Sequence, residues 1–247
     1  MSQDQERLEG RISALAALEA GVRRFDALLV RRGFDQEKLA DLLAAARARK
    51  VEIREVDEAE LEAHGKSHGG VVALVGPKPL TAPQALYELL EKAGKPPFVV
   101  LLEGADDDRN LGYAVRTAEA FGAQAVLVRR RAWDVDAPAL SRASSGSFER
   151  LPIVLVDRDL GEVQELKRRR LKLVGCIPRA RDSLYKVGLD QALILAIGGE
   201  KRGLSGAVRS ICDRLACIPT VGGPSSLSMT QAAAVALAEV ARQRGLT

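Results

Sequence analysis

The chain is poor in cysteine, histidine and aromatic residues, and each shortage removes a class of function. Its three cysteines form no C-x-x-C pair, which argues against both a disulfide framework and a zinc site. The only histidines, His64 and His68, lie far along the chain from the serine-rich segment at residues 222–230, so a serine hydrolase is disfavoured. Aromatic residues make up 4% of the chain, too few to indicate a platform on which single-stranded bases stack.

Long hydrophobic runs are also missing. No run approaches the ~18 apolar residues of a membrane span, and the first residues are polar and acidic. We therefore expect a soluble, cytoplasmic protein without a membrane anchor or signal peptide. Lys and Arg number 37 against 33 for Asp and Glu, a balance that permits a nucleic-acid partner without requiring one. With 247 residues, 47% of them hydrophobic, the chain can bury a sizeable core.

Apolar patterns divide the chain into two α/β units joined by a proline-rich segment. Residues 1–76 alternate helix-like stripes with short strand-like runs. Prolines then punctuate residues 77–97, which we interpret as a linker with a helix over 83–92. From residue 98, apolar runs alternate with helical stretches, as in strands buried on both faces of a parallel sheet. These runs cover residues 98–102, 125–128, 171–175, 193–197 and 215–218.

Three segments follow such runs, at the strand ends where parallel sheets place their ligands. The first holds Asn110, which suits an N-cap or the first turn of a helix, and Arg116, whose long side chain can reach back toward the helix start. Taken alone, this segment is more simply a capped helix with a surface arginine. The aspartates at positions 106–108 point in different directions, so they indicate a solvated loop rather than a magnesium site.

The second segment is the turn at residues 198–205. Its glycines follow a buried strand and let a ligand approach the backbone closely. The segment lacks the G-x-x-x-x-G-K-[ST] spacing of a phosphate-binding loop. Glu200 either pairs with a cation or caps the following helix, and the residues alone leave both interpretations open.

The third segment, residues 222–230, is rich in hydroxyl groups. Its serines lie just before the last predicted helix, so they can hydrogen-bond a ligand or cap that helix. Ser226 and Ser228 are the candidate caps. Two basic clusters, at residues 129–131 and 167–170, can contact phosphates, but a solvated surface is the simpler interpretation of each.

Together, in this order, the three segments resemble the signature motifs of the SpoU-type RNA ribose 2′-O-methyltransferases. The first motif is similar to Asn110-Leu111-Gly112 with Arg116-Thr117-Ala118, the second to Gly198-Gly199-Glu200 with Gly203-Leu204, and the third to Ile218-Pro219 through Ser225-Ser226-Leu227. Residues 68–71 and 144–152 also resemble parts of this family, so the resemblance covers nearly the whole chain. The most similar group is that of the bacterial large-subunit rRNA guanosine 2′-O-methyltransferases and their thiostrepton-resistance relatives.

This resemblance implies an α/β fold with two domains. Residues 1–76 would form a small RNA-binding domain, and residues 98–247 a parallel-sheet domain with a deep trefoil knot. The knot would bind S-adenosylmethionine. The expected partners are RNA, above all 23S rRNA, and a second copy of the chain in a homodimer formed through the C-terminal domain; no DNA or membrane partner is expected.

The resemblance also assigns residues. The catalytic set would be Asn110, Arg116, Glu200 and Ser226, and the cofactor set Gly198, Gly199, Ile218, Gly222, Leu227 and Ser228. Arginine stays protonated in proteins, so we expect Arg116 to orient the ribose hydroxyl and stabilise developing negative charge rather than act as a base. Asn110 and Glu200 would position Arg116, and Ser226 would hydrogen-bond near the substrate.

Two residues depart from the family pattern. Ser228 stands where asparagine is usual, and a lost hydrogen bond of about 0.5–1.5 kcal/mol would indicate a slower enzyme. Gly199 stands where alanine is common and is expected only to loosen its loop. Ser228 also favours an alternative, a knotted RNA-binding protein that has lost catalysis. Methylation of tRNA is a third hypothesis, disfavoured because the tRNA-modifying relatives usually lack an N-terminal domain.

Overall fold

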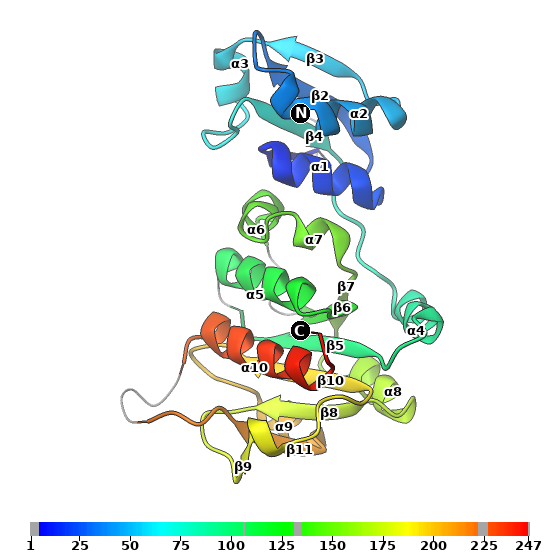
Figure 1. Ribbon diagram of the computed structural model, residues 1–247, viewed down its shortest axis with the longest axis vertical. Coiled ribbons are helices and arrows are strands. Elements are labelled where there is room, and N and C mark those ends of the chain that lie inside the picture. Colours follow the sequence, from blue (N-terminus) through cyan, green and yellow to red (C-terminus); the bar gives the residue numbers. More distant parts are fainter. Residues whose placement is uncertain (1–4, 106, 131–134, 222–226, 247) are drawn as a thin grey trace. The chain divides into compact units, whose positions relative to one another are not determined.

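The computed structural model describes residues 5–105, 107–130, 135–221 and 227–246 (Figure 1). They form two compact units: the first extends to Pro79 and takes in Asp136–Arg150, and the second contains the rest. The chain therefore passes between the units three times. The sequence patterns predict domains at residues 1–76 and 98–247. Packing differs from this division because it places Asp136–Arg150 in the first unit.

The first unit contains a four-stranded sheet in the order β1-β4-β2-β3, in which only β2 and β3 are parallel. Its strands are β1 (Glu6–Glu9), β2 (Phe25–Arg31), β3 (Ile53–Val56) and β4 (Val71–Val75). Its helices are α1 (Arg11–Ala20), η1 (Glu37–Leu39), α2 (Ala40–Ala48), α3 (Glu58–Glu62), α6 (Ala137–Ala143) and α7 (Ser147–Arg150). Leu18 of α1 and Leu42 of α2 pack on one face of the sheet, and Leu61 of α3 packs on the other.

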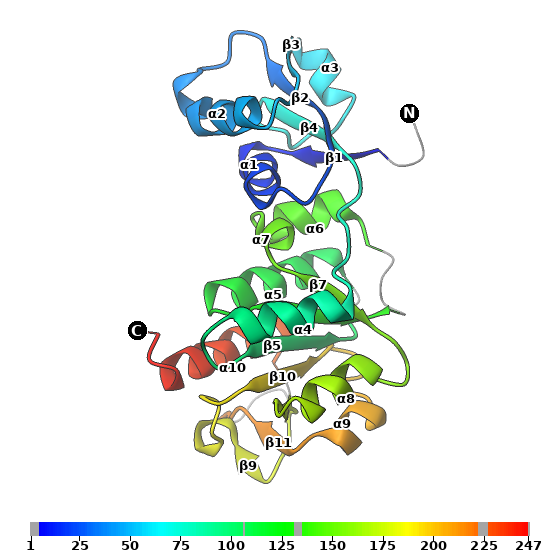
Figure 2. The ribbon, with the colours of Figure 1, turned by 90° about the vertical axis from the view of Figure 1, so that its right-hand side faces the viewer.

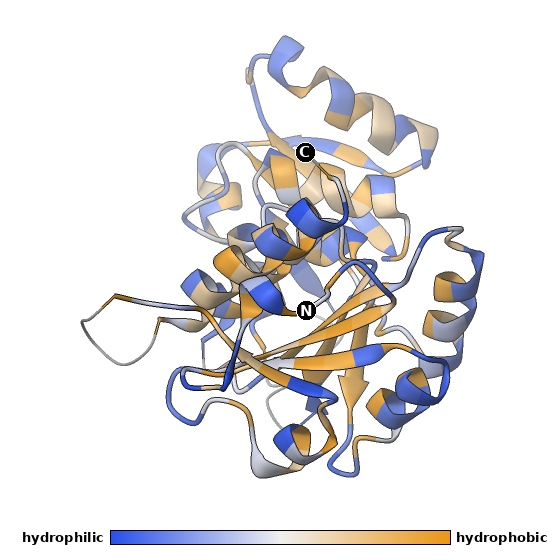
Figure 3. Ribbon diagram, turned by 60° about the horizontal axis from the view of Figure 1, so that its bottom comes forward, coloured by the Kyte–Doolittle hydropathy of each residue, from blue (hydrophilic) through white to orange (hydrophobic). Residues whose placement is uncertain are grey.

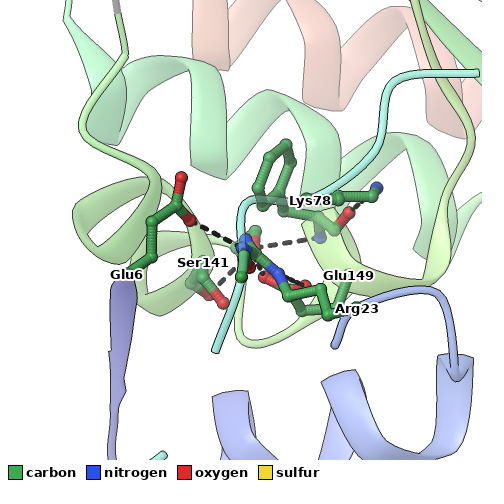
Figure 4. Close-up of polar contacts among 8 residues, drawn as sticks. Glu6, Arg23, Lys78, Ser141 and Glu149 are labelled. Carbon is green, nitrogen blue, oxygen red and sulfur yellow. Dashed lines mark hydrogen bonds and ion pairs between the residues drawn. The ribbon is translucent and has the colours of Figure 1, made fainter. Parts of the chain in front are cut away.

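A buried charge network joins α7 to the N-terminal part of this unit (Figure 4). The side chains of Arg23 and Glu149 are both fully buried, at 0% exposure. Arg23 donates through Nε and Nη2 to the two carboxylate oxygens of Glu149, at 2.7 and 3.1 Å. Its Nη1 donates to Glu6 Oε2 at 2.6 Å and to the carbonyl oxygen of Gly76 at 2.8 Å. Because burying a charge is costly unless it is paired, these bonds fix α7 in the first unit.

The second unit contains a seven-stranded sheet in the order β7-β6-β5-β10-β8-β11-β9. All its pairings are parallel, so the parallel α/β sheet expected from the apolar runs is confirmed. The strands are β5 (Phe98–Glu103), β6 (Ala125–Arg129), β7 (Ile153–Val156), β8 (Lys172–Cys176), β9 (Asp182–Ser183), β10 (Leu193–Gly198) and β11 (Arg214–Cys217). The helices are α4 (Pro83–Lys92), α5 (Asp108–Ala120), α8 (Gly161–Arg168), η3 (Leu184–Lys186), α9 (Gly206–Ile211) and α10 (Met229–Gln243).

Helices cover both faces of this sheet, which explains why its central strands are mostly apolar (Figures 2 and 3). The helices α4, α8 and α9 pack through residues such as Leu86, Leu166 and Val208 on one face. The helices α5 and α10 pack against each other, and α10 also contacts β10. The helix expected over 83–92 is thus present as α4, and it belongs to the core of the second unit. Among the described residues, no helix combines the length and hydropathy needed to cross a membrane.

Candidate functional site

A pocket opens in the second unit where β8, β10 and β11 end. It brings together five of the residues that the sequence predicts from its second and third motifs: Gly198, Gly199, Glu200, Ile218 and Leu227. We call it the glycine pocket. Carboxyl ends of adjacent parallel strands are the usual place for a ligand in such a sheet. The predicted residues Gly222 and Ser226 lie outside the described residues.

The glycines of this pocket are required by close backbone contacts. A Cβ atom on Gly198 would lie 2.2 Å from the carbonyl carbon of Gly203, and one on Gly199 would lie 1.8 Å from the carbonyl oxygen of Gly104. The Gly199 N–H also donates to the carbonyl oxygen of Glu103 at 2.6 Å. The expectation that Gly199 only loosens its loop is therefore wrong, because its missing Cβ is what allows the turn to lie against the loop after β5.

Replacing Gly199 with alanine is expected to displace this turn. The overpacking should lower the free energy of unfolding by about 1–3 kcal/mol and weaken the binding of S-adenosylmethionine, measured by titration calorimetry. Gly206→Ala is the matched control, because a Cβ at Gly206 meets nothing within 4 Å. Equal cofactor affinity in the two variants would contradict the requirement for glycine at position 199.

Glu103, at the end of β5, holds the other end of the turn. Its Oε2 accepts a hydrogen bond from the Ser205 N–H at 2.8 Å, and its Oε1 lies 3.7 Å from Nε of Arg129. Ser205 in turn caps α9 by accepting from the Val208 N–H. Sequence reasoning missed Glu103 as a functional residue. The sequence feature that could have indicated it is a glutamate at the end of a strand whose other residues are apolar.

The first motif lies on α5, and its residues are placed differently from those of the pocket. Asp107 caps α5, and the N–H groups of Arg109 and Asn110 that donate to its carboxylate hold its pKa below the usual value. Asn110 therefore lies in the first turn. Arg116 lies on the exposed side of α5. Within the described part of the chain, no hydrogen bond joins Arg116 to Asn110 or Glu200, and neither Asn110 nor Arg116 lines the glycine pocket.

Ser228 is the N-cap of α10. Its Oγ accepts from the Gln231 N–H at 3.2 Å, and the Gln231 side chain accepts from the Ser228 N–H at 3.1 Å, which completes a capping box. Ser228 does not line the glycine pocket. Serine and asparagine are about equally good N-caps, so this position accepts either residue without loss of the helix end.

The pocket also contains residues that the sequence analysis did not assign. Cys176, the last residue of β8, and residues 177–178 line it together with Thr220. Burial raises the pKa of the Cys176 thiol to about 11, so this group is neutral at pH 7. Among the described residues, no cluster of three or more His, Cys, Asp or Glu could hold a metal ion.

An all-parallel sheet with a glycine-lined pocket at the ends of its central strands defines the second unit as a ligand-binding α/β domain. Two family models narrow this class. The model of the SpoU rRNA Methylase family matches residues 97–238, and that of RNA 2′-O ribose methyltransferase substrate binding matches residues 7–81. The chain therefore belongs to the SpoU rRNA methylase family, as its motifs predict.

Individual relatives cover almost the whole chain. The 23S rRNA (guanosine-2′-O-)-methyltransferase RlmB of Pseudomonas putida is 32% identical over 240 residues, which is 97% of each chain. An uncharacterized tRNA/rRNA methyltransferase of Mycobacterium avium is 34% identical over 98% of this chain and 79% of its own length. The crystal structure of the SpoU methyltransferase AviRb from Streptomyces viridochromogenes with AdoMet matches with a TM-score of 0.82 at 28% identity, over 99% of this chain and 92% of that one.

Proposed function

We propose that the protein transfers a methyl group from S-adenosylmethionine to a ribose 2′-hydroxyl of RNA, with 23S rRNA as the substrate. The observation that carries this proposal is the convergence of the second and third motifs in one pocket, with Gly198, Gly199, Ile218 and Leu227 in its lining. The similarity to RlmB and to the AdoMet complex of AviRb supports the same substrate and cofactor.

The lining of the glycine pocket fits this cofactor. Ile197, Ile218 and Leu227 supply apolar walls for an adenine ring, and the close-packed turn supplies backbone groups that can hydrogen-bond a nucleoside. The cofactor supplies an activated methyl carbon when bound. The residues of the chain would align the acceptor and exclude water.

We infer that Arg116 acts on the RNA. A guanidinium keeps its proton, so Arg116 would orient the ribose hydroxyl and a neighbouring phosphate and stabilise the developing alkoxide. A phosphate oxygen of the RNA can accept the proton of the hydroxyl. Asn110 and Glu200 are proposed to position Arg116 in the complex with RNA, and the role of Ser226 stays a prediction.

We also infer that residues 98–247 form the methyltransferase domain with a deep trefoil knot, and residues 1–76 the RNA-binding domain. The strand order supports the knot, because the chain forms β9 at the sheet edge, returns to the centre as β10, and then inserts β11 between β8 and β9. A homodimer through the C-terminal domain is part of the same proposal, and the exposed ring of Tyr113 on α5 offers an apolar surface for such a contact.

The two alternatives have less support. Ser228 is accounted for by its capping of α10, so it does not by itself indicate lost catalysis. The substrate-binding model matches residues 7–81 of this chain, whereas the A. aeolicus TrmH/SpoU tRNA modifying enzyme covers 66% of it. rRNA is therefore preferred over tRNA.

Calorimetry with S-adenosylmethionine and transfer of labelled methyl groups to 23S rRNA and to total tRNA test the proposal together. We expect cofactor binding and alkali-stable labelling of 23S rRNA, because a 2′-O-methyl group blocks alkaline cleavage of the chain. Labelling of tRNA alone would contradict the substrate. RNA binding without cofactor binding or transfer would contradict the enzymatic function.

A further inference from the structure

A second and larger hollow, of about 1450 Å³, opens at the ends of β7, β6, β5 and β10. Gly203 lines both this hollow and the glycine pocket, so the turn at residues 198–205 forms a wall that the two share. We call it the arginine cleft, because its lining includes Arg129, Arg130, Arg158 and Arg202. It lies entirely within the second unit.

Most of the carboxylates in this cleft are already held by the protein. Asp157 forms a 2.5 Å ion pair with Arg130, and Glu103 is held by the Ser205 N–H and lies 3.7 Å from Arg129. Asp159 accepts a hydrogen bond from the Gly161 N–H at 3.2 Å. Asp108 lies in the first turn of α5, where the helix dipole favours a negative charge.

Two arginines of the cleft are left without such partners. Arg158 and Arg202 are exposed, and within the described residues neither side chain forms a hydrogen bond or an ion pair. In addition, Nη1 of Arg129 is buried and has no hydrogen-bond partner in the part of the chain that the structure describes. Counting Lys201, the lining holds five basic side chains against four carboxylates, so the cleft carries a small excess of positive charge on groups that can donate to an anion.

The positions of the two free arginines indicate an extended ligand. Arg158 follows β7 and Arg202 follows β10, and two strands lie between β7 and β10 in the sheet. At ~4.8 Å between neighbouring strands, the ends of β7 and β10 are roughly 14 Å apart. A chain of phosphates can contact both arginines at once, whereas a small single anion fits one of them.

We propose that the arginine cleft holds the phosphate backbone of the RNA strand that flanks the methylated nucleotide, with Arg158 and Arg202 as its main contacts. The proposal rests on the proposed function, because it assigns the glycine pocket to the methyl donor and the neighbouring cleft to the acceptor. Arginine suits this role because its planar fork matches two phosphate oxygens.

The test uses the full-length protein and a 23S rRNA transcript made in vitro. Arg158→Gln, Arg202→Gln and the double variant remove charge from exposed positions. Each phosphate contact contributes about 0.7 to the slope of log affinity against log salt for single strands, so the double variant should lose about 1.4 from that slope. At ~0.15 M salt, its affinity for the transcript should fall roughly tenfold. The affinity for S-adenosylmethionine should not change.

Arg209→Gln is the matched control. Arg209 is exposed on α9 and does not line the cleft. The proposal would be overturned if the double variant and this control bound the transcript with the same affinity and the same salt slope. A double variant that binds RNA normally but changes its oligomeric state in sedimentation would also overturn it, in favour of a contact between copies.

The same measurements separate the two proposals. RNA affinity is read without methyl transfer, so a wild-type protein that shows the expected salt dependence but transfers no methyl group would overturn only the proposed function. Methyl transfer that is unaffected in the double variant, with unchanged affinity for the transcript, would overturn only the role of the cleft.

Discussion

Replacement of Arg116 by alanine is expected to slow methyl transfer to RNA by about 10²–10³-fold, because that is the usual effect of removing a donor aimed at developing negative charge. The affinity for S-adenosylmethionine should be unchanged, since Arg116 does not line the glycine pocket. The fold should also persist, because the side chain is exposed and forms no ion pair within the described residues. Single-turnover rates at saturating RNA give the size of the effect.

Two further variants make this prediction specific to the guanidinium. Arg116→Lys keeps the charge but loses the planar fork, so an intermediate rate is expected. Arg109→Ala removes another arginine of the same helix, whose side chain is 73% exposed. Equal rates for Arg109→Ala and Arg116→Ala would show that Arg116 has no special role in the reaction.

Much of the second unit could be predicted because its apolar runs encode strands directly. All five runs recognised in the sequence are strands of the parallel sheet: β5, β6, β8, β10 and β11. The strand β7 was missed, although its four residues, Ile153–Val156, are all apolar. The strand β9 has only Asp182 and Ser183, and it is defined by its pairing with β11 rather than by any pattern of its own.

The first unit shows a similar limit at its edge. The strand β1 (Glu6–Glu9) has three charged residues and one leucine, so its sequence does not suggest a strand. Its backbone pairs with β4, and burial of Leu8 in the core holds it in place. An edge strand can be polar because half of its surface faces solvent, and hydropathy alone therefore fails to find it.

Local glycine patterns indicated the residues of the glycine pocket, but the contacts that fix its turn are long-range in sequence. Gly198, Gly199 and Ile218, which the motifs assign to one site, line one pocket, and the family match confirms the family that the motifs indicated. Glu103 and Gly104 could not be assigned, because their contacts with the turn join residues about a hundred positions apart in sequence. Hydrophobic periodicity does not indicate which backbone atoms come into contact when distant segments fold together.

The same limit applies to the pair formed by Arg23 and Glu149, which are 126 positions apart. Arg23→Met is expected to destabilise the first unit by about 3–5 kcal/mol, because it leaves the Glu149 carboxylate buried without its partner. Arg11→Met should change stability by less than about 1 kcal/mol, since the Arg11–Asp41 pair is exposed. Denaturant unfolding of the two variants measures the difference.

A second substitution tests the cause of this loss. Adding Glu149→Leu to Arg23→Met removes the unpaired charge, so much of the lost stability should return.

Arg23 lies in the region matched by the substrate-binding model and Glu149 in the region matched by the methylase model, so their ion pair connects a segment of one region to the other. Cofactor affinity should survive in Arg23→Met because the glycine pocket belongs to the second unit, while affinity for 23S rRNA should fall as the first unit unfolds. If the Arg23→Met and Arg11→Met variants had the same free energy of unfolding, the buried pair would not be what holds α7 in the first unit.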